Sequence, residues 1–258
     1  MTGLATTFGL PSYDATLEID PAATTAVILA AGRGERLRPF TDRIPKALID
    51  VRGVPLLDYH LNLLHDAGIR HVVVVVGYLA DAIRDHVGGG EAIGLQVEYV
   101  EQGTPRGTGH AVAAALNRVA SDPFVVAYAD VYWGLGSGIY RELLADRGPK
   151  IVAAHVEDGG RYGRLELATW PGRVELRAIH EKDGRATPAL VNGGLYLLPV
   201  ALGERLHDLL PSVRGEIELT DAVTGLARWG HAIQVLIADT WFDVGTPARW
   251  SEANGGTP

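Results

Sequence analysis

The sequence predicts an α/β fold with a doubly wound, mostly parallel sheet, because short apolar runs alternate with segments of helical periodicity. Short runs that are rich in valine and isoleucine are typical of parallel strands that are covered on both faces. Five such runs occur, at 26–30, 72–76, 95–100, 124–128 and 151–156. We expect them to form the buried centre of the sheet.

Segments between these runs have apolar residues at helical spacing. In 55–67, Leu57, Leu61 and Leu64 fall on one helical face, and Gly68 is placed to end the helix. The segments 79–87 and 107–119 show the same pattern. A Rossmann-like half is therefore expected over about residues 25–130.

The pattern changes after about residue 150, where apolar and polar residues alternate and predict antiparallel strands. The expected strands lie at 162–169, 172–182 and 189–199, followed by helices near 200–210 and 218–229, a strand at 232–238 and a turn over 239–250. We expect this antiparallel lobe, at about 150–240, to be built onto the first half. Residues 25–258 would then be one domain and residues 1–24 an N-terminal extension.

Composition narrows the function classes. The chain has 258 residues, a formal net charge of −8 and no cysteine. The acidic balance argues against a nucleic-acid partner, and the absence of cysteine excludes disulfides and thiolate chemistry. Without an apolar stretch of membrane-spanning length or a secretory signal, we expect no membrane association and a cytoplasmic location. The oligomeric state is open, and a homo-oligomer is compatible with the sequence.

Basic residues are concentrated after the first apolar run. Six basic residues and only three acidic ones fall within 33–52 of this otherwise acidic chain. The basic residues are Arg33, Arg36, Arg38, Arg43, Lys46 and Arg52. Small residues at 30–32 and Gly34 would let backbone N–H groups approach an anion. The loop is therefore predicted to bind a polyphosphate, with Arg36 and Lys46 as counter-charges.

Other site templates do not fit the chain. The dinucleotide fingerprint G-x-G-x-x-G would need glycine at position 37, where Leu37 stands, and the chain has no G-K-[ST] tripeptide. A nicotinamide oxidoreductase is therefore disfavoured. The nine histidines form no Ser/His/Asp arrangement that would indicate a hydrolase, and no His/Cys spacing indicates zinc.

The loop and the residues after it resemble the signature of the sugar-1-phosphate nucleotidyltransferases, in the nucleoside-triphosphate transferase family. Leu29–Pro39 followed by Pro45–Leu48 is similar to L-x-[AG]-G-x-G-x-R-L-x-P and P-K-x-L. Further motifs follow in the family's order to about residue 250, in a compact, single-domain format. The resemblance implies transfer of a nucleoside monophosphate from an NTP to a sugar 1-phosphate, with release of pyrophosphate.

The resemblance assigns the nucleotide to the first half. The backbone of Leu29, Ala31, Gly32 and Gly34 would cradle it, and Arg36 and Lys46 would hold the triphosphate. Gln102 matches the glutamine that reads the base, near the helix start at Gly107 and Thr108, whose free N–H groups suit a polar ligand edge. A primary amide can match uracil, thymine or cytosine, so the base stays open.

The same resemblance implies a Mg²⁺ ion held by Asp130 and Asp243. Asp130 follows an apolar run, where open α/β sheets bind ligands, and Asp243 lies in a W-x-D-x-G-T-P motif. An isolated aspartate at such a place is usually a turn former. Two carboxylates and phosphate oxygens together suit Mg²⁺. Ala129 replaces the glycine that usually precedes the first aspartate.

The sugar phosphate is expected in the antiparallel lobe. By resemblance, Lys182 would meet the phosphate, and Glu181 and Asn192 would bond sugar hydroxyls. Tyr162 and Gly163 match further acceptor-binding positions. The family usually has E-K-P at this place, and Asp183 replaces the proline, which leaves the path of this loop open.

Two other functions remain compatible with the sequence. A cytidylyltransferase acting on phosphocholine, a polyol phosphate or a phosphonate would share the fold and change the acceptor. A catalytically silent NDP-sugar-binding subunit would not need Arg36, Lys46, Asp130 and Asp243 together, which disfavours it.

Overall fold

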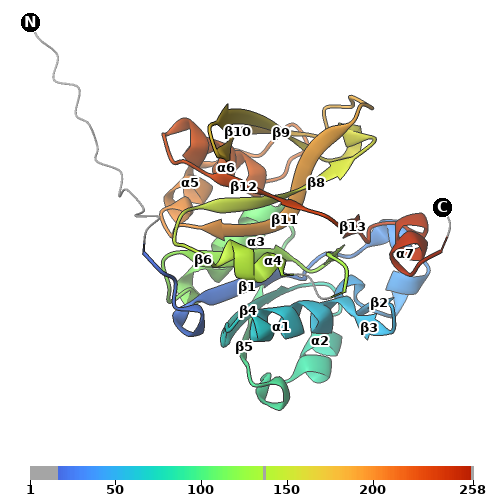
Figure 1. The fold of residues 1–258 in the computed structure, drawn as a ribbon. Coiled ribbons are helices and arrows are strands. Elements are labelled where there is room, and N and C mark those ends of the chain that lie inside the picture. Colours follow the sequence, from blue (N-terminus) through green and yellow to red (C-terminus); the bar gives the residue numbers. More distant parts are fainter. Residues whose placement is uncertain (1–16, 136–137, 257–258) are drawn as a thin grey trace, which may run out of the picture.

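The computed structural model describes residues 17–135 and 138–256. Its first half contains four parallel strands that match the predicted apolar runs closely. They are β1 (Thr25–Leu29), β4 (His71–Val76), β5 (Gln96–Glu101) and β6 (Phe124–Tyr128). They lie in the order β5-β4-β1-β6, as Figure 1 shows. This part of the sheet is parallel as predicted.

The second half continues the same sheet. Its strands are β8 (Lys150–Val156), β9 (Gly163–Trp170), β10 (Arg173–Glu181), β11 (Ala189–Leu198) and β12 (Gln234–Ala238). Among the described residues, nine strands form one sheet in the order β5-β4-β1-β6-β11-β8-β12-β10-β9. β11 is antiparallel to both β6 and β8, whereas β12 is parallel to β8. The sheet is therefore mixed: the strands expected to be antiparallel, at 162–169, 172–182 and 189–199, are so, whereas the run at 151–156, expected among the parallel strands, is antiparallel to β11.

Helices cover both faces of this sheet (Figure 1). They are α1 (Leu56–Asp66), α2 (Ala80–Val87), α3 (Thr108–Ala115), α4 (Ile139–Leu143), α5 (Leu202–Asp208) and α6 (Leu219–Arg228). Alternate residues of β1 divide the core: Ile28 packs on the side of α1, α2 and α4, and Val27 on the side of α3, α5 and α6. The helix expected over 107–119 ends at Ala115, and a 3₁₀ turn follows it.

The segment predicted as a turn over 239–250 contains regular structure. It forms β13 (Phe242–Asp243) and the start of α7 (Pro247–Ala253). β13 pairs with β7 (Val131–Tyr132), and a second small pair joins β2 (Asp50–Val51) to β3 (Val54–Pro55). Strands of two residues have no periodicity that a sequence could reveal. The β7–β13 pair nevertheless brings together two segments more than a hundred positions apart.

The N-terminal extension predicted over 1–24 lies outside the described residues up to position 16. Its last part forms a 3₁₀ turn, Pro21–Ala23, directly before β1. This turn approaches the end of α1, since a Cβ added to Gly68 would lie 3.0 Å from Cβ of Pro21. Across 17–135 and 138–256, none of the helices has the length and apolar character needed to cross a membrane.

Candidate active site

Two adjoining pockets open where β1 and β6 end, the edge at which α/β sheets bind ligands. The first has a volume of about 280 Å³ and the second about 260 Å³. Both are lined by Thr108, Tyr128, Asp130 and Glu216. A ligand in one pocket would therefore meet a ligand in the other at Asp130.

The first pocket collects the residues predicted to bind a nucleotide. Those that line it are Leu29, Ala31, Gly32, Lys46, Gln102, Gly107 and Thr108. A Cβ added to Gly32 would meet nothing within 4 Å, which fits a backbone left open to a ligand. The wall is largely apolar and suits a flat base better than a charged group.

Gly34 supports this pocket without lining it. Its φ of +65° is left-handed, and a Cβ there would lie 2.9 Å from Cγ2 of Thr41 and 3.1 Å from Cβ of Lys46. Its carbonyl accepts a 2.8 Å hydrogen bond from the Thr41 hydroxyl. The glycine predicted to approach a ligand instead allows Lys46 to approach the loop.

Gln102 and Thr108 are held by neighbouring backbone groups. Gln102 is nearly buried, and its Nε2 donates to the Gly107 carbonyl over 3.0 Å. Thr108 does not cap its own helix. Its hydroxyl accepts a 3.0 Å hydrogen bond from the Leu219 amide at the first residue of α6. The start of α3 is thereby tied to the start of α6.

Asp130 and Asp243 lie beside each other across the β7–β13 pair. Asp243 pairs with Val131 in the ladder, and the Val244 amide donates to the Asp130 carbonyl over 2.8 Å. Lys46 forms an ion pair with Asp130. Burial would raise the pKa of Asp130, but the Lys46 ammonium outweighs it and holds that pKa below its ordinary value. Burial and the Asp130 charge raise the pKa of Asp243.

The basic cluster of the first loop is dispersed in space. Arg36 lines the second pocket rather than the first, and its Nη2 would lie 2.9 Å from a Cβ on Gly245. Arg38 pairs with Asp42 over 3.1 Å, and Nε of Arg52 donates to the Ala253 carbonyl over 2.9 Å. Only Arg36 and Lys46 of the six basic residues line these two pockets. The clustering of six basic residues in the sequence therefore indicated the pockets less well than the two motif positions Arg36 and Lys46 did.

The second pocket collects the residues predicted to bind the acceptor. They are Tyr162, Gly163, Glu181, Lys182 and Asn192, together with Arg36 and Asp243. The Asn192 Oδ1 accepts hydrogen bonds from the Tyr196 hydroxyl at 2.7 Å and the Gly194 amide at 3.0 Å. The oxygen is thus engaged within the protein, so the side chain of Asn192 can act toward a ligand only as a donor. Burial raises the pKa of Glu181.

Several further residues of this pocket were not predicted from the sequence. They include Arg214, Glu216, Trp241 and Arg249. Nη2 of Arg214 lies 2.5 Å from Glu218 and 3.8 Å from Glu181. The Trp241 indole donates to the Gly193 carbonyl over 3.0 Å and packs edge-on against Tyr162. One signal existed, because Arg214 directly precedes the G-E-I-E-L segment assigned to the second lobe.

A buried histidine lies behind the strand that follows Asp130. His60 is fully buried; its Nε2 donates to the Val131 carbonyl, and its Nδ1 accepts from the Tyr140 hydroxyl, each over 2.8 Å. Burial lowers the pKa of His60 from 6.5 to about 4. The neutral ring therefore holds β7 through the Val131 carbonyl.

Protonation of His60 should make the fold sensitive to acid. Because the folded-state pKa is the lower one, stability is complete above pH 6.5 and falls as the pH drops toward 4, by up to about 3 kcal/mol. His60→Gln keeps a donor for Val131 and removes the titration. Urea unfolding at pH 7 and pH 4.5 should show a smaller loss for this variant than for the wild type. Equal losses would contradict the prediction.

Known proteins resemble this chain over most of its length. The family model described as nucleotidyl transferase matches residues 25–257. Glucose-1-phosphate thymidylyltransferase of Streptomyces antibioticus is 35% identical over 233 residues, which are 89% of this chain and 65% of that protein. The UTP–glucose-1-phosphate uridylyltransferase AglF of Haloferax volcanii is 32% identical, over 88% of this chain and 94% of that protein.

The fold has been seen before as well. A UDP-glucose pyrophosphorylase crystallised with UDP-glucose superimposes with a TM-score of 0.79 at 22% identity, over 90% of this chain and 97% of that one. The chain spans only 64–65% of the length of several longer relatives, including the Streptomyces protein. The family match, which covers both pockets, shows that this chain belongs to the nucleotidyl transferase family.

Proposed function

We propose that the protein transfers a nucleoside monophosphate from an NTP to a sugar 1-phosphate, giving an NDP-sugar and pyrophosphate. One observation carries this proposal: a largely apolar pocket and a pocket rich in charged groups meet at Asp130. Relatives that match most of this chain are named as glucose-1-phosphate nucleotidyltransferases. The nucleotide is assigned to the first pocket and the sugar phosphate to the second.

The reaction needs positioning and counter-charge more than proton transfer. A phosphate monoester has a second pKa near about 6, so the acceptor is largely a dianion at neutral pH and needs no general base. The difficulty is the approach of two polyanions. Lys46 in the first pocket and Arg36 in the adjoining second pocket are assigned to the triphosphate, which would extend past Asp130. Lys182 is assigned to the acceptor phosphate, so that an acceptor oxygen lies in line with the α-phosphorus.

Asp130 and Asp243 fit a divalent cation such as Mg²⁺. Burial and then the charge of Asp130 raise the pKa of Asp243, and a cation between the two carboxylates would relieve their mutual repulsion. Within the described ranges no third carboxylate or histidine completes a metal cluster, so phosphate oxygens would supply the remaining ligands. When bound, the ion would neutralise charge on the phosphates as they react.

The sugar is assigned to the polar wall beside Lys182. The Glu181 carboxylate can accept from sugar hydroxyls, while Asn192 can only donate, because Oδ1 is already bonded within the protein. Arg214 adds a cation to the same wall. A hexose 1-phosphate has the hydroxyls and the charge that this wall complements.

A screen of nucleotides against acceptors tests the proposed function. The protein is incubated with each of UTP, dTTP, CTP, ATP and GTP and with hexose 1-phosphates, phosphocholine or polyol phosphates, and pyrophosphate release is measured. Release is expected with UTP or dTTP and a hexose 1-phosphate. Release only with CTP and a non-sugar acceptor would reassign the second pocket. Calorimetric binding of an NDP-sugar without release from any pair would indicate a silent binding subunit.

Gln102 should set the preference among bases. With Nε2 donating to Gly107, the amide oxygen is left to accept from the base: uracil and thymine offer N3–H at the centre of the Watson–Crick edge, whereas cytosine has the acceptor N3 there and can donate only from N4. Gln102→Ala is expected to reduce the preference for UTP or dTTP over CTP by about tenfold to a hundredfold. The ratio of kcat/KM values for the nucleotides measures this, and an unchanged ratio would refute the assignment.

A further inference from the structure

Residues 182–187, the Lys182 turn, form a strained connection. It follows β10, and Lys182 has a left-handed φ of +47°, which a non-glycine residue adopts only when its surroundings enforce it. The Lys182 amide donates to the Tyr162 carbonyl over 3.0 Å, and the Gly184 amide donates to the Gly160 carbonyl over 3.2 Å. The turn is therefore fastened to the 3₁₀ turn Gly159–Arg161 before β9.

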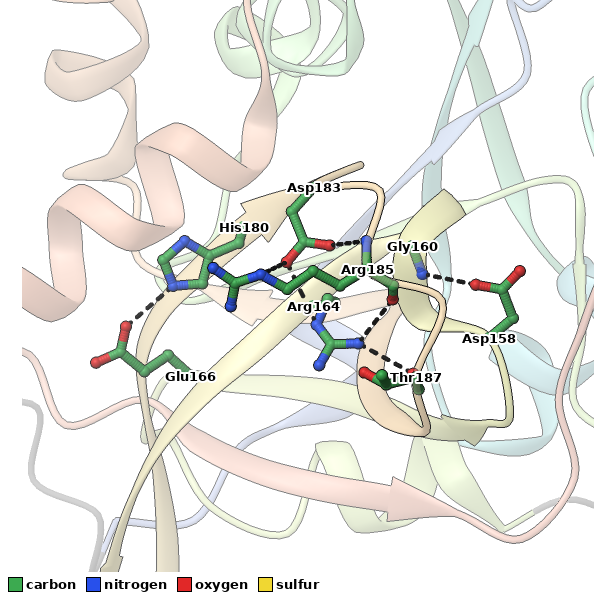
Figure 2. Close-up of polar contacts among 8 residues, drawn as sticks. All are labelled: Asp158, Gly160, Arg164, Glu166, His180, Asp183, Arg185 and Thr187. Carbon is green, nitrogen blue, oxygen red and sulfur yellow. Dashed lines mark hydrogen bonds and ion pairs between the residues drawn. The ribbon is translucent and has the colours of Figure 1, made fainter.

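Arg164 fastens the other side of this turn, as Figure 2 shows. Its Nε lies 3.4 Å from Oδ2 of Asp183, and its Nη1 donates to the carbonyls of Arg185 at 3.3 Å and Thr187 at 3.0 Å. Asp183 also accepts a 2.9 Å hydrogen bond from the Arg185 amide. The side chains of Arg164 and Asp183 are each only 19% exposed, so the pair is sheltered from solvent.

The guanidinium of Arg164, with its forked donors, is well suited to holding the turn in place. A guanidinium presents several donors in fixed directions, and here they reach one carboxylate and two carbonyls of a single turn. Arg164 follows Gly163, which lines the second pocket, so the side chain points to the opposite face of β9. The fork therefore braces the turn from outside the pocket and meets no substrate.

Asp183 stands where the family has proline, and for this reason the sequence alone did not predict the path of the loop. The structure supplies its path: Asp183 closes the turn on the Arg185 amide and pairs with Arg164. Contact with the neighbouring 3₁₀ turn is close, since a Cβ added to Gly160 would lie 2.8 Å from the Gly184 carbonyl carbon. Little room remains for the turn to shift while these contacts hold.

We propose that Arg164 is a positioning residue that, through Asp183, holds the Lys182 turn in its left-handed form and so places Lys182 in the second pocket. This rests on the proposed function only in taking Lys182 to meet the acceptor phosphate. Lysine is a flexible point charge, so the path of its backbone decides where the ammonium can reach. Holding that backbone in place before binding avoids an ordering cost when the acceptor arrives.

Kinetics of Arg164→Ala test the proposal. The variant is expected to lower kcat/KM for the acceptor by about tenfold to a hundredfold, as loss of a supporting contact usually does, and to leave the KM for the NTP unchanged. Arg164→Lys should recover only part of the loss. Glu166→Ala is the matched control, because Glu166 pairs with His180 over 3.0 Å on the same hairpin without touching the turn.

A double-mutant cycle with Lys182→Ala separates positioning from general support. If Arg164 acts through Lys182, Arg164→Ala should cost little further acceptor kcat/KM once Lys182 is absent. Independent, multiplying losses would overturn the proposal. If Arg164→Ala does not fold, Asp183→Asn replaces it in the cycle.

Hydrogen exchange provides a readout that does not need turnover. Amides of residues 182–187 should exchange at least tenfold faster in Arg164→Ala, and at the wild-type rate in Glu166→Ala. Unchanged exchange in Arg164→Ala would overturn the proposal even in an active enzyme. If the wild type turns over no NTP and sugar phosphate pair, the proposed function fails, while faster exchange would still show that Arg164 holds the turn.

Discussion

Asp243→Asn should abolish nearly all turnover while leaving the fold at least as stable as the wild type. Asp243 lines the second pocket beside Asp130, and burial, together with the charge of Asp130, raises the pKa of Asp243. In the absence of ligands its ionised form is therefore a cost to the folded state. The neutral asparagine removes this repulsion and also removes one of the two carboxylates assigned to the cation.

The expected loss in kcat/KM is about a thousandfold, the scale on which removal of a directed charge affects a transition state. The melting temperature without metal should stay the same or rise. Addition of Mg²⁺ with the NTP should raise the melting temperature of the wild type more than that of Asp243→Asn. Wild-type turnover by this variant would exclude the metal role of Asp243.

Asp130→Asn is the informative comparison, because its activity should fall equally while its stability moves the other way. Asp130 is the partner of Lys46, whose side chain is only 13% exposed. Asparagine would leave that ammonium without its counter-charge and lower the free energy of unfolding by about 1–3 kcal/mol. Asp81→Asn, at a side chain that is 96% exposed, serves as a neutral control.

Gly107→Ala should be the most disruptive change at the nucleotide pocket. Gly107 has φ of +102° and ψ of 175°, a region that essentially only glycine occupies. A Cβ there would lie 2.6 Å from the Ile217 carbonyl oxygen and 3.0 Å from the Ile217 nitrogen. Both are backbone atoms, which cannot move aside as the end of a side chain can. The start of α3 and the segment before α6 would have to separate.

We expect a loss of about 3 kcal/mol in the free energy of unfolding and a marked rise in the KM for the NTP. Gln102 loses its anchor at the same time, since its amide donates to the Gly107 carbonyl. Gly103→Ala is the matched control on the same loop: its φ is +68°, but an added Cβ meets nothing within 4 Å. It should cost about 1 kcal/mol and leave the KM unchanged. Equal effects at both positions would contradict the collision argument.

Local sequence patterns predicted the individual strands and helices well, but they did not predict which strands lie side by side in the sheet. The five apolar runs are strands, and Leu57, Leu61 and Leu64 lie buried on one face of α1, because burial imposes periodicity on a single segment. Nothing in such a pattern says which strand lies beside which. The place of β11 between β6 and β8 depends on contacts between residues about seventy positions apart. The sequence therefore predicted a parallel half and an antiparallel lobe, but not the order in which their strands join into one sheet.

The candidate site shows the same division. Positions inside dense motifs, such as Lys46, Asp130 and Lys182, line the two pockets. Arginine is common in this chain, so Arg249 was missed, and Arg214 was missed although it adjoins the G-E-I-E-L segment. Arg164 was missed for a different reason. Its importance comes from backbone carbonyls that it contacts across a turn, and these have no signature in side-chain identity.

The position of β11 has a mechanical consequence. Its ladder with β6 spans residues 195–198, while Asn192, earlier on the same strand, lines the second pocket. A hinge motion that moved one pocket away from the other would have to break the hydrogen bonds between β11 and β6. We therefore expect reactants to enter, and products to escape, by movement of the loops at the rim, with the platform beneath them staying rigid through the whole cycle.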